Sequence, residues 1–144
     1  MSKIYEIIID TNVLLSGLRS RQGASFKLLS MLNDPRWQVN ISTTLVMEYE
    51  AVLKRELSSL NLSLADIDSL LDSFCAIAKQ HNIFYIWRPT TPDPNDDFLV
   101  DLAIEAQIDY IISYNKKDLY PIKKLGVGVI TPKEFLQLTG EIKQ

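Results

Sequence analysis

The pattern of apolar and polar residues is clearest at the beginning of the chain. Ile4–Ile9 is an apolar run interrupted only by Tyr5 and Glu6, and it stops at Asp10. A short run rich in β-branched residues that ends at polar residues predicts a buried parallel strand with a carboxylate at its carboxyl end. Ligands of open α/β sheets bind at that end. Asp10 therefore has two interpretations, a ligand-facing carboxylate or a cap of the following turn.

The remainder of the chain alternates short strands with helices, a pattern typical of a parallel α/β sheet. The further predicted strands are Gln38–Ser42, Ile83–Trp87, Tyr110–Ser113 and Gly128–Thr131. The predicted helices are Ala24–Leu32, Thr43–Leu57, Leu64–Lys79, Asp96–Ala106 and Pro132–Leu138. We therefore predict a single domain over residues 1–144. Its fold is a three-layer α/β/α sandwich around a central parallel sheet of about five strands, with right-handed crossovers.

Composition places the chain among ordinary globular proteins. Of its 144 residues 47% are hydrophobic and 23% are charged, which is typical of a soluble domain. No apolar stretch approaches the roughly 18 residues of a membrane span, so we expect no membrane partner. The single cysteine, Cys75, allows no internal disulfide and fits a reducing cytoplasm. We therefore expect a cytoplasmic protein.

The rarity of histidine and cysteine limits the chemistry. His81 and Cys75 are single, whereas a structural zinc site takes four such ligands. A Cys75–His81 nucleophile pair stays open, although Cys75 lies in an apolar helical stretch that favours a packed thiol. Carboxylates remain, and hard oxygen ligands select Mg²⁺ or Mn²⁺. A net charge of −3 argues against a dedicated basic nucleic-acid module, but not against an enzyme that uses a metal ion.

Helical periodicity separates the acidic residues of the predicted helix Asp96–Ala106. Its apolar stripe consists of Leu99, Leu102, Ala103 and Ala106. Asp96 falls near the centre of that stripe, and so we expect it to point inward. Asp97, Asp101 and Glu105 fall on the opposite side, where we expect solvent. An acid in the first turn also complements the helix dipole, which is the structural alternative for Asp96.

Two further acidic or amide positions follow predicted strands. In the helix after strand Gln38–Ser42, periodicity favours Glu48 over Glu50 because Glu48 borders the apolar face and lies closer to the strand end. Asn115 and Asp118 follow strand Tyr110–Ser113. For these two the alternative is structural, with Asn115 as the N-cap of a short helix and Asp118 exposed.

Taken together, these segments resemble the PIN domain family of metal-dependent ribonucleases (PilT N-terminus-like). The segments are Asp10–Gly17 (DTNVLLSG), Ser42–Tyr49 (STTLVMEY), Asp93–Ala103 (DPNDDFLVDLA) and Ile111–Leu119 (IISYNKKDL). The resemblance covers essentially the whole chain in the right order. It is strongest to the bacterial and archaeal branch described as toxins of toxin–antitoxin pairs.

The resemblance implies a Mg²⁺ or Mn²⁺ site built from acidic residues. By position, the catalytic residues are Asp10, Glu48, Asp96 and Asn115, and the metal ligands are Asp10, Glu48, Asp96 and, as the alternative fourth ligand, Asp118. The family pattern after the fourth strand reads threonine, any residue, aspartate or asparagine. Here Ser113 replaces the threonine and Asn115 occupies the acidic position. Because Asn115 carries no charge, a second metal ion is harder to hold.

The function implied by the resemblance is an endoribonuclease that hydrolyses single-stranded RNA, and a toxin with a cognate antitoxin protein. Homo-oligomers, dimeric or tetrameric, are compatible with it. The candidate substrate contacts are Asn12, Arg19, Arg21, Ser113, Lys116 and Lys117. The alternative is a weak or inactive PIN-like scaffold that binds protein or RNA. Phosphatase and receiver-domain readings are weaker, since Asn12 stands where an aspartate-nucleophile phosphatase needs its general acid.

Overall fold

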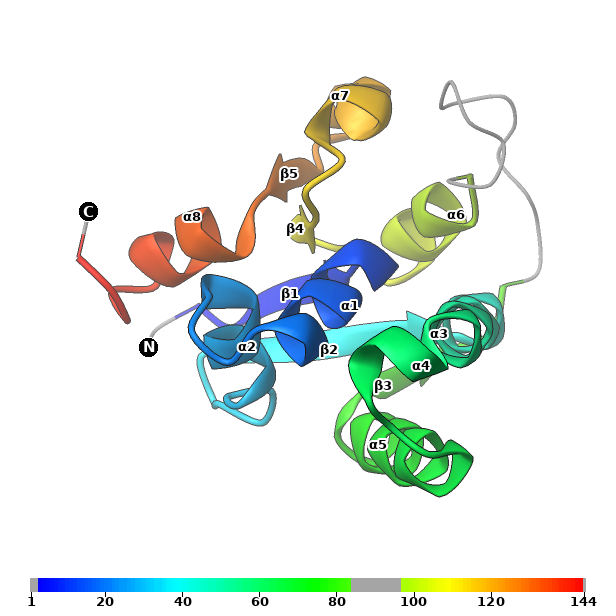
Figure 1. Ribbon diagram of the computed structural model, residues 1–144. Helices are drawn as coiled ribbons and strands as arrows, with labels where there is room; N and C mark the ends of the chain where they lie inside the picture. The colour runs from blue at the N-terminus through cyan, green and yellow to red at the C-terminus, as the bar shows by residue number, and fades with distance from the viewer. Residues whose placement is uncertain (1–2, 84–96, 144) are drawn as a thin grey trace.

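The central element of the computed structural model is a five-stranded sheet. The structure describes residues 3–83 and 97–143, and at Asp97 it describes the backbone alone. All paired strands are parallel, in the order β3-β2-β1-β4-β5 (Figure 1). The strands are β1 Tyr5–Ile9, β2 Trp37–Ser42, β3 Lys79–His81, β4 Tyr110–Ile112 and β5 Gly128–Ile130. The order reverses beside β1, so the chain crosses from one half of the sheet to the other there. The predicted α/β class and parallel sheet are confirmed.

The helices connect these strands. They are α1 Thr11–Arg19, α2 Ala24–Leu29, α3 Thr43–Arg55, α4 Leu57–Leu60, α5 Leu64–Ile77, α6 Asp97–Glu105, α7 Lys116–Leu119 and α8 Pro132–Leu138, with a 3-10 helix at Tyr120–Leu125. Four of them (α1, α3, α5 and α8) begin at a side-chain cap. The Ser42 hydroxyl accepts from the Leu45 N–H at 3.2 Å and so starts α3 directly after β2. Ser63 with Asp66, and Thr131 with Glu134, form capping boxes that start α5 and α8.

The third strand lies elsewhere than the pattern predicts. The sequence predicts it at Ile83–Trp87 and extends a helix to Lys79, whereas α5 ends at Ile77 and β3 is Lys79–His81. Ile83 itself is not in a strand, and residues 84–87 lie outside the described part. The polar sequence of β3 carries no apolar alternation, so only its pairing with β2 identifies it as a strand. The pattern also gives no sign of α1.

A buried amide holds this strand to the sheet. Asn40 is fully buried in β2, and its Nδ2 donates to Glu6 Oε1 and to the Gln38 carbonyl oxygen, both at 3.0 Å. Its Oδ1 accepts from His81 Nε2 at 2.7 Å. Three neighbouring strands are therefore joined by side chains as well as by their backbone ladder.

Aromatic packing fixes the last helix on the sheet. The buried ring of Phe135 in α8 lies 5.2 Å from Trp37, 6.1 Å from Tyr5 and 6.4 Å from Tyr110, measured between ring centroids. These three partners belong to β2, β1 and β4. Edge-to-face arrangements of this kind stabilise beyond the area they bury. The helix α8 is therefore anchored across the middle of the sheet and also packs on α2.

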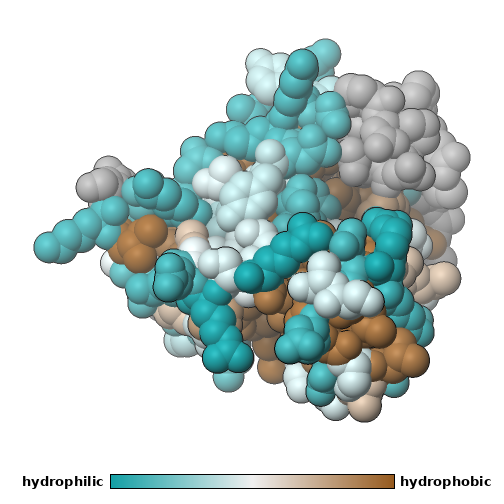
Figure 2. Space-filling view, in the orientation of Figure 1, coloured by the Kyte–Doolittle hydropathy of each residue, from teal (hydrophilic) through white to brown (hydrophobic). Residues whose placement is uncertain are grey.

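The surface in the orientation of Figure 1 is largely hydrophilic, with a hydrophobic patch at the lower right over α4 and α5 (Figure 2). Leu64 and Ile77 of α5 are among the exposed large apolar side chains. Among the described residues, no helix has both the length and the apolar character needed to cross a membrane.

Candidate functional site

Asp10 is a buried carboxylate at the carboxyl end of β1. Its relative exposure is 7%. One carboxylate oxygen, Oδ1, accepts from the Thr11 N–H at 2.8 Å and caps α1, while Oδ2 accepts from the Ser113 hydroxyl at 2.7 Å. The capping interpretation of Asp10 is therefore confirmed, and its place at the edge of the sheet where ligands bind leaves the ligand-facing interpretation a prediction.

A small polar network joins the ends of β1 and β4 around this carboxylate. Ser113, fully buried, follows β4 and also accepts from the Asn115 backbone N–H at 2.9 Å. Asn12 donates from Nδ2 to Ser113 Oγ at 3.3 Å and accepts the Tyr114 N–H at its Oδ1 at 3.2 Å. The sequence-predicted positions 10, 12, 113 and 115 are thus brought together by hydrogen bonds between two adjacent strand ends.

The charge of Asp10 is incompletely compensated. Burial raises the pKa of this carboxyl above its ordinary value, while the hydrogen bonds from Ser113 and Thr11 oppose the shift. The negative charge of Glu48 adds to the rise in the pKa of Asp10. The carboxylate of Glu48 in α3 therefore repels that of Asp10, which follows β1 directly. A cation bound between them would reduce this repulsion.

The orientation of α3 distinguishes Glu48 from its neighbour Glu50. Glu50 is exposed and forms an ion pair with Lys54 at 3.2 Å, one helical turn away. Glu48 is also exposed, but its charge acts on Asp10. The two glutamates therefore differ in their partners, and the preference for Glu48 as a site residue stays a prediction.

Tyr49 positions α3 and is a residue whose role the sequence analysis missed. It is fully buried, and its hydroxyl donates to the carbonyl oxygen of Ile9, the residue before Asp10. Its ring packs edge-on against Phe74 of α5, with 5.2 Å between centroids. Periodicity counts Tyr49 only as part of the apolar face, so nothing in the pattern reveals that its hydroxyl ties the helix carrying Glu48 to the strand carrying Asp10.

The acidic residues near α6 give one correction. Asp96 and the side chain of Asp97 lie outside the described residues, so the inward position of Asp96 stays a prediction. Asp101, predicted to face solvent, is 6% exposed, which shows that this prediction is wrong. The physical reason is that α6 is covered on every side at this level, since residues 99–103 are all buried. Glu105, one turn later, is exposed as expected.

Asn115 contacts the polar network, whereas Asp118 lies further along the chain in α7. Asn115 is partly buried directly before α7, and no side-chain hydrogen bond from it caps this helix. Asp118 is partly buried within α7. Asn115 contacts Ser113 through its backbone N–H, and the choice between Asn115 and Asp118 as the fourth site residue stays a prediction.

The candidate basic contacts fall into two groups. Arg19 forms an ion pair with Glu56 at 3.1 Å, and Lys116 forms one with Glu134 at 2.9 Å. Within the described residues, neither Arg21 nor Lys117 forms an ion pair, and both are exposed. These two are therefore the candidates whose charge is available to an anion.

The donors that the structure places suit a hard cation. The acidic ones in position are Asp10 and Glu48, and in residues 3–83 and 97–143 no three acidic, histidine or cysteine side chains cluster around one point. Carboxylate and amide oxygens are ligands of Mg²⁺ and Mn²⁺, and His81 is engaged with Asn40 on another part of the sheet. The residues present therefore fit one divalent ion, with Asp96 as the predicted third carboxylate.

The cysteine–histidine alternative loses support. Cys75 and His81 line the same small groove beside α3, of about 170 Å³. However, burial and the charge of Asp72 raise the pKa of the Cys75 thiol, whereas a nucleophilic cysteine needs a lowered pKa. We therefore assign no catalytic role to Cys75.

Comparisons with known proteins give the family and the fold. A family model described as the PIN domain matches residues 6–117. Among curated proteins nothing matches the chain. A structure of VapBC2 from Rickettsia felis, bound to a DNA fragment from their promoter, is similar with a TM-score of 0.59 and 13% identity over 88% of this chain and 98% of that chain. A structure of VapBC-1 from nontypeable Haemophilus influenzae is similar with a TM-score of 0.59 and 13% identity over 89% and 98% of the two chains.

Replacing Asp10 by asparagine tests the electrostatic conflict. Because the pKa of Asp10 is raised in the folded protein, its ionised form opposes folding, and this penalty grows as pH rises through the folded-state pKa. Asp10→Asn accepts the Thr11 N–H without a charge, so in a chelator it should be more stable than the wild type at pH 7–8. The gap should close towards pH 4. Thermal unfolding against pH measures this, and a wild type that is more stable at every pH would contradict it.

Removing the Tyr49 hydroxyl tests how α3 is positioned. Tyr49→Phe leaves the Ile9 carbonyl oxygen without its partner, which should lower the free energy of unfolding by about 1–3 kcal/mol. Displacement of Glu48 should also weaken Mn²⁺ binding about tenfold, as loss of an orienting contact does. Denaturant unfolding and Mn²⁺ calorimetry provide the measurements, with Tyr120→Phe at an exposed tyrosine as the control. Unchanged Mn²⁺ affinity would mean that Tyr49 has a purely structural role.

Proposed function

The chain belongs to the PIN domain family, and from this premise we propose that it is a metal-dependent endoribonuclease that hydrolyses single-stranded RNA. One observation carries the proposal. A carboxylate buried at the carboxyl edge of a parallel sheet, Asp10, is opposed by the charge of Glu48. Two neighbouring carboxylates, one of them buried, destabilise the folded protein when no cation is bound, and together they can bind a cation.

The side chains around Asp10 have separate parts in this proposal. Asp10, Glu48 and Asp96 would hold a Mg²⁺ or Mn²⁺ ion, which when bound lowers the pKa of coordinated water and stabilises charge on a phosphoryl group. Ser113 and the Thr11 N–H fix the carboxylate of Asp10 through 2.7 and 2.8 Å hydrogen bonds. Tyr49 holds α3, and with it Glu48, against the end of β1.

The polar residues at the rim orient rather than react. Asn12 is held between Asp10, Ser113 and the Tyr114 N–H, so its position is set by both strand ends. Its place beside the carboxylate suits it to orient water or a ribose hydroxyl. We propose that hydrolysis leaves a 5′-phosphate on the product, as the family resemblance implies.

We also propose that the protein acts in a cytoplasmic toxin–antitoxin pair. The resemblance to the toxin branch supports this, and both structural neighbours described above are VapBC structures. The partner would be a small antitoxin protein, and a dimer or tetramer of this chain is compatible with the proposal. A neighbouring reading frame that encodes a small DNA-binding protein would support it, and co-purification of the two products would test it.

The competing function is a weak or inactive PIN-like scaffold. The observation that favours it is Asn115, a neutral residue where the family pattern allows an acid. It predicts binding of RNA or protein without metal-dependent cleavage. Cleavage that Mn²⁺ supports and that Asp10→Ala abolishes would exclude it.

The neighbouring glutamates of α3 provide a matched test of the nuclease. Glu48→Gln should lower Mn²⁺-dependent cleavage of a single-stranded RNA by at least about a hundredfold, since it removes a metal ligand. Glu50→Gln makes the same charge change on the same helix, and among the described residues the ion-pair partner of Glu50 is Lys54, so its activity should stay near that of the wild type. Gel analysis with and without a chelator measures both. Cleavage that persists in excess chelator would rule out the mechanism.

The fourth position of the site is tested by metal titration. We expect Asn115 to be the site member and Asp118 to act indirectly, so Asn115→Ala should weaken Mn²⁺ binding more than Asp118→Ala does. Asn115→Asp adds a charge, which should tighten Mn²⁺ binding and lower the stability of the metal-free protein. Asp96→Ala gives the reference loss for a ligand. Wild-type affinity in Asn115→Ala with a collapse in Asp118→Ala would assign the ligand to Asp118 instead.

A further inference from the structure

A groove of about 470 Å³ lies between α2 and α8. We propose that this groove binds the backbone and one base of a single-stranded RNA, at a place separate from the site where the RNA is cut. The inference rests on the proposed function and extends it, because it assigns the RNA a path across the protein surface. Among the described residues the groove is formed by residues 21–23, one face of α2, part of α8 and Ile142 near the end of the chain.

The lining combines positive charge with an exposed aromatic ring. Its cations are Arg21, Lys27 and Lys133, and its apolar members include Phe26 and Leu136. Phe26 is 37% exposed although its ring is large and apolar. Proteins that hold single-stranded nucleic acid combine these two features, cations for phosphates and an aromatic platform for a base. In Figure 2 hydrophilic residues surround a small hydrophobic patch in the region of α2 and α8.

Two of the three cations are available to an anion. In the part of the chain that the structure describes, neither Arg21 nor Lys133 forms an ion pair, and both are exposed. Lys27 lies 3.8 Å from a carboxylate oxygen of Glu141, a loose pair with a half-exposed amine. The chain as a whole has a net charge of −3, so this concentration of cations is a local departure from the rest of the surface.

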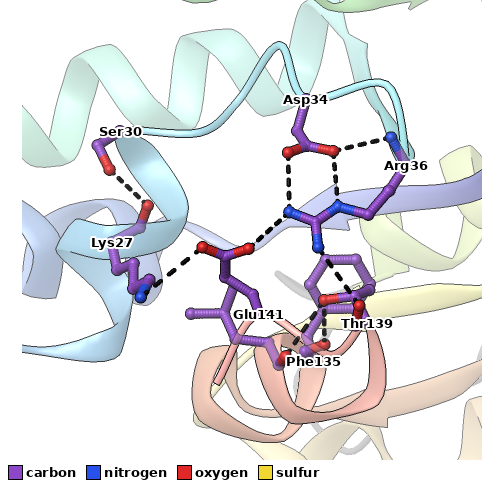
Figure 3. Close-up of polar contacts among 8 residues, drawn as sticks. Lys27, Ser30, Asp34, Arg36, Phe135, Thr139 and Glu141 are labelled. Carbon is purple, nitrogen blue, oxygen red and sulfur yellow. Dashed lines mark hydrogen bonds and ion pairs between the residues drawn. The ribbon is translucent and has the colours of Figure 1, made fainter. Parts of the chain in front are cut away.

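The wall of the groove is built before any ligand arrives. Glu141 accepts from Arg36 at 2.8 Å, and Arg36 in turn forms a two-pronged pair with Asp34 at 2.9 Å (Figure 3). Because Arg36 is shared between Asp34 and Glu141, Glu141 keeps negative charge toward Lys27, and the cations that the groove offers to an anion are Arg21 and Lys133. The network fixes the segment after α8 against α2, so binding costs little ordering of the protein.

Helix α2, which forms one wall of the groove, is connected by hydrogen bonds from its buried side to the candidate metal site. The Ser25 hydroxyl of α2 and the Tyr114 hydroxyl are 2.6 Å apart, and the Tyr114 N–H donates to Asn12 beside Asp10. Lys133 follows β5 closely, so it also lies at the carboxyl end of the sheet. An RNA strand cut near Asp10 would pass over the exposed ring of Tyr114 to reach the groove. The exposed ring of Phe26 beside the cations favours RNA over an acidic protein segment as the occupant.

A paired charge reversal tests the phosphate contacts. The probe is a fluorescent single-stranded RNA oligomer, and anisotropy is measured in excess chelator so that nothing is cut. Arg21→Glu/Lys133→Glu should weaken binding at least about tenfold and reduce the slope of log affinity against log salt by about 1.4, because each phosphate contact on a single strand contributes roughly 0.7. The control Arg55→Glu/Lys124→Glu makes the same charge change at two exposed residues away from the groove and should retain near wild-type affinity.

Substitution of Phe26 tests the base contact separately. Phe26→Ala should weaken RNA binding about tenfold without changing the salt slope, because stacking involves no counterions. Phe26→Trp keeps an aromatic face and should retain the affinity. Circular dichroism of each variant verifies the fold, so a loss of binding in a folded variant is attributable to the groove.

The outcomes separate this inference from the proposed function. A protein that binds RNA through the groove but cuts none with Mn²⁺ would refute the nuclease and leave the groove intact. Equal losses in the groove and control pairs, or no RNA binding by the wild type, would overturn the groove. A glutamate-rich peptide that displaces nothing supports RNA as the occupant, whereas tight peptide binding lost only in Arg21→Glu/Lys133→Glu would assign the groove to an acidic protein segment.

Discussion

The burial of Asp10 is the constraint on which the site depends. A carboxylate with 7% exposure needs partners, and the fold supplies them from two adjacent strand ends, the Thr11 N–H after β1 and the Ser113 hydroxyl after β4. These contacts hold the group without neutralising it, since burial and Glu48 still raise the pKa of Asp10. The ionised carboxylate of Asp10 is therefore unfavourable in the folded protein, and a divalent cation bound beside it would stabilise the ionised form.

The other elements of the site are positioned by the backbone of the sheet. Tyr49 reaches the main chain of β1, Asn12 joins the segment after β4, and Ser25 reaches Tyr114 from α2. Each contact crosses between elements that are far apart in the sequence. The position of Asp10 is thus set by contacts that exist only in the assembled sheet.

Much of this arrangement follows from the sequence, and the exceptions have physical reasons. The apolar run identifies the strand Tyr5–Ile9 in the sequence. Helix α8 is identified by its apolar periodicity and by Pro132 at its start. Strand β3 cannot be identified in this way, because its residues are polar and only its hydrogen bonds to β2 make it a strand. The burial of Asp101 cannot be identified either, because helical phase assumes one solvent face and α6 has none at that level. The hydroxyl of Tyr49 is invisible for a similar reason, since apolar patterning ignores the polar end of an aromatic side chain.

The hydrogen bond between Asn40 and His81 bears on how easily the open edge of the sheet pairs with another molecule. Within the described residues β3 is the outermost strand on its side, and an open strand edge invites pairing with another chain. Here the edge is three residues long, carries Lys79 and has its last residue bound sideways by the buried amide. Such a short, charged and tethered edge offers little for a foreign strand to extend, and so it protects the sheet from growing into an aggregate.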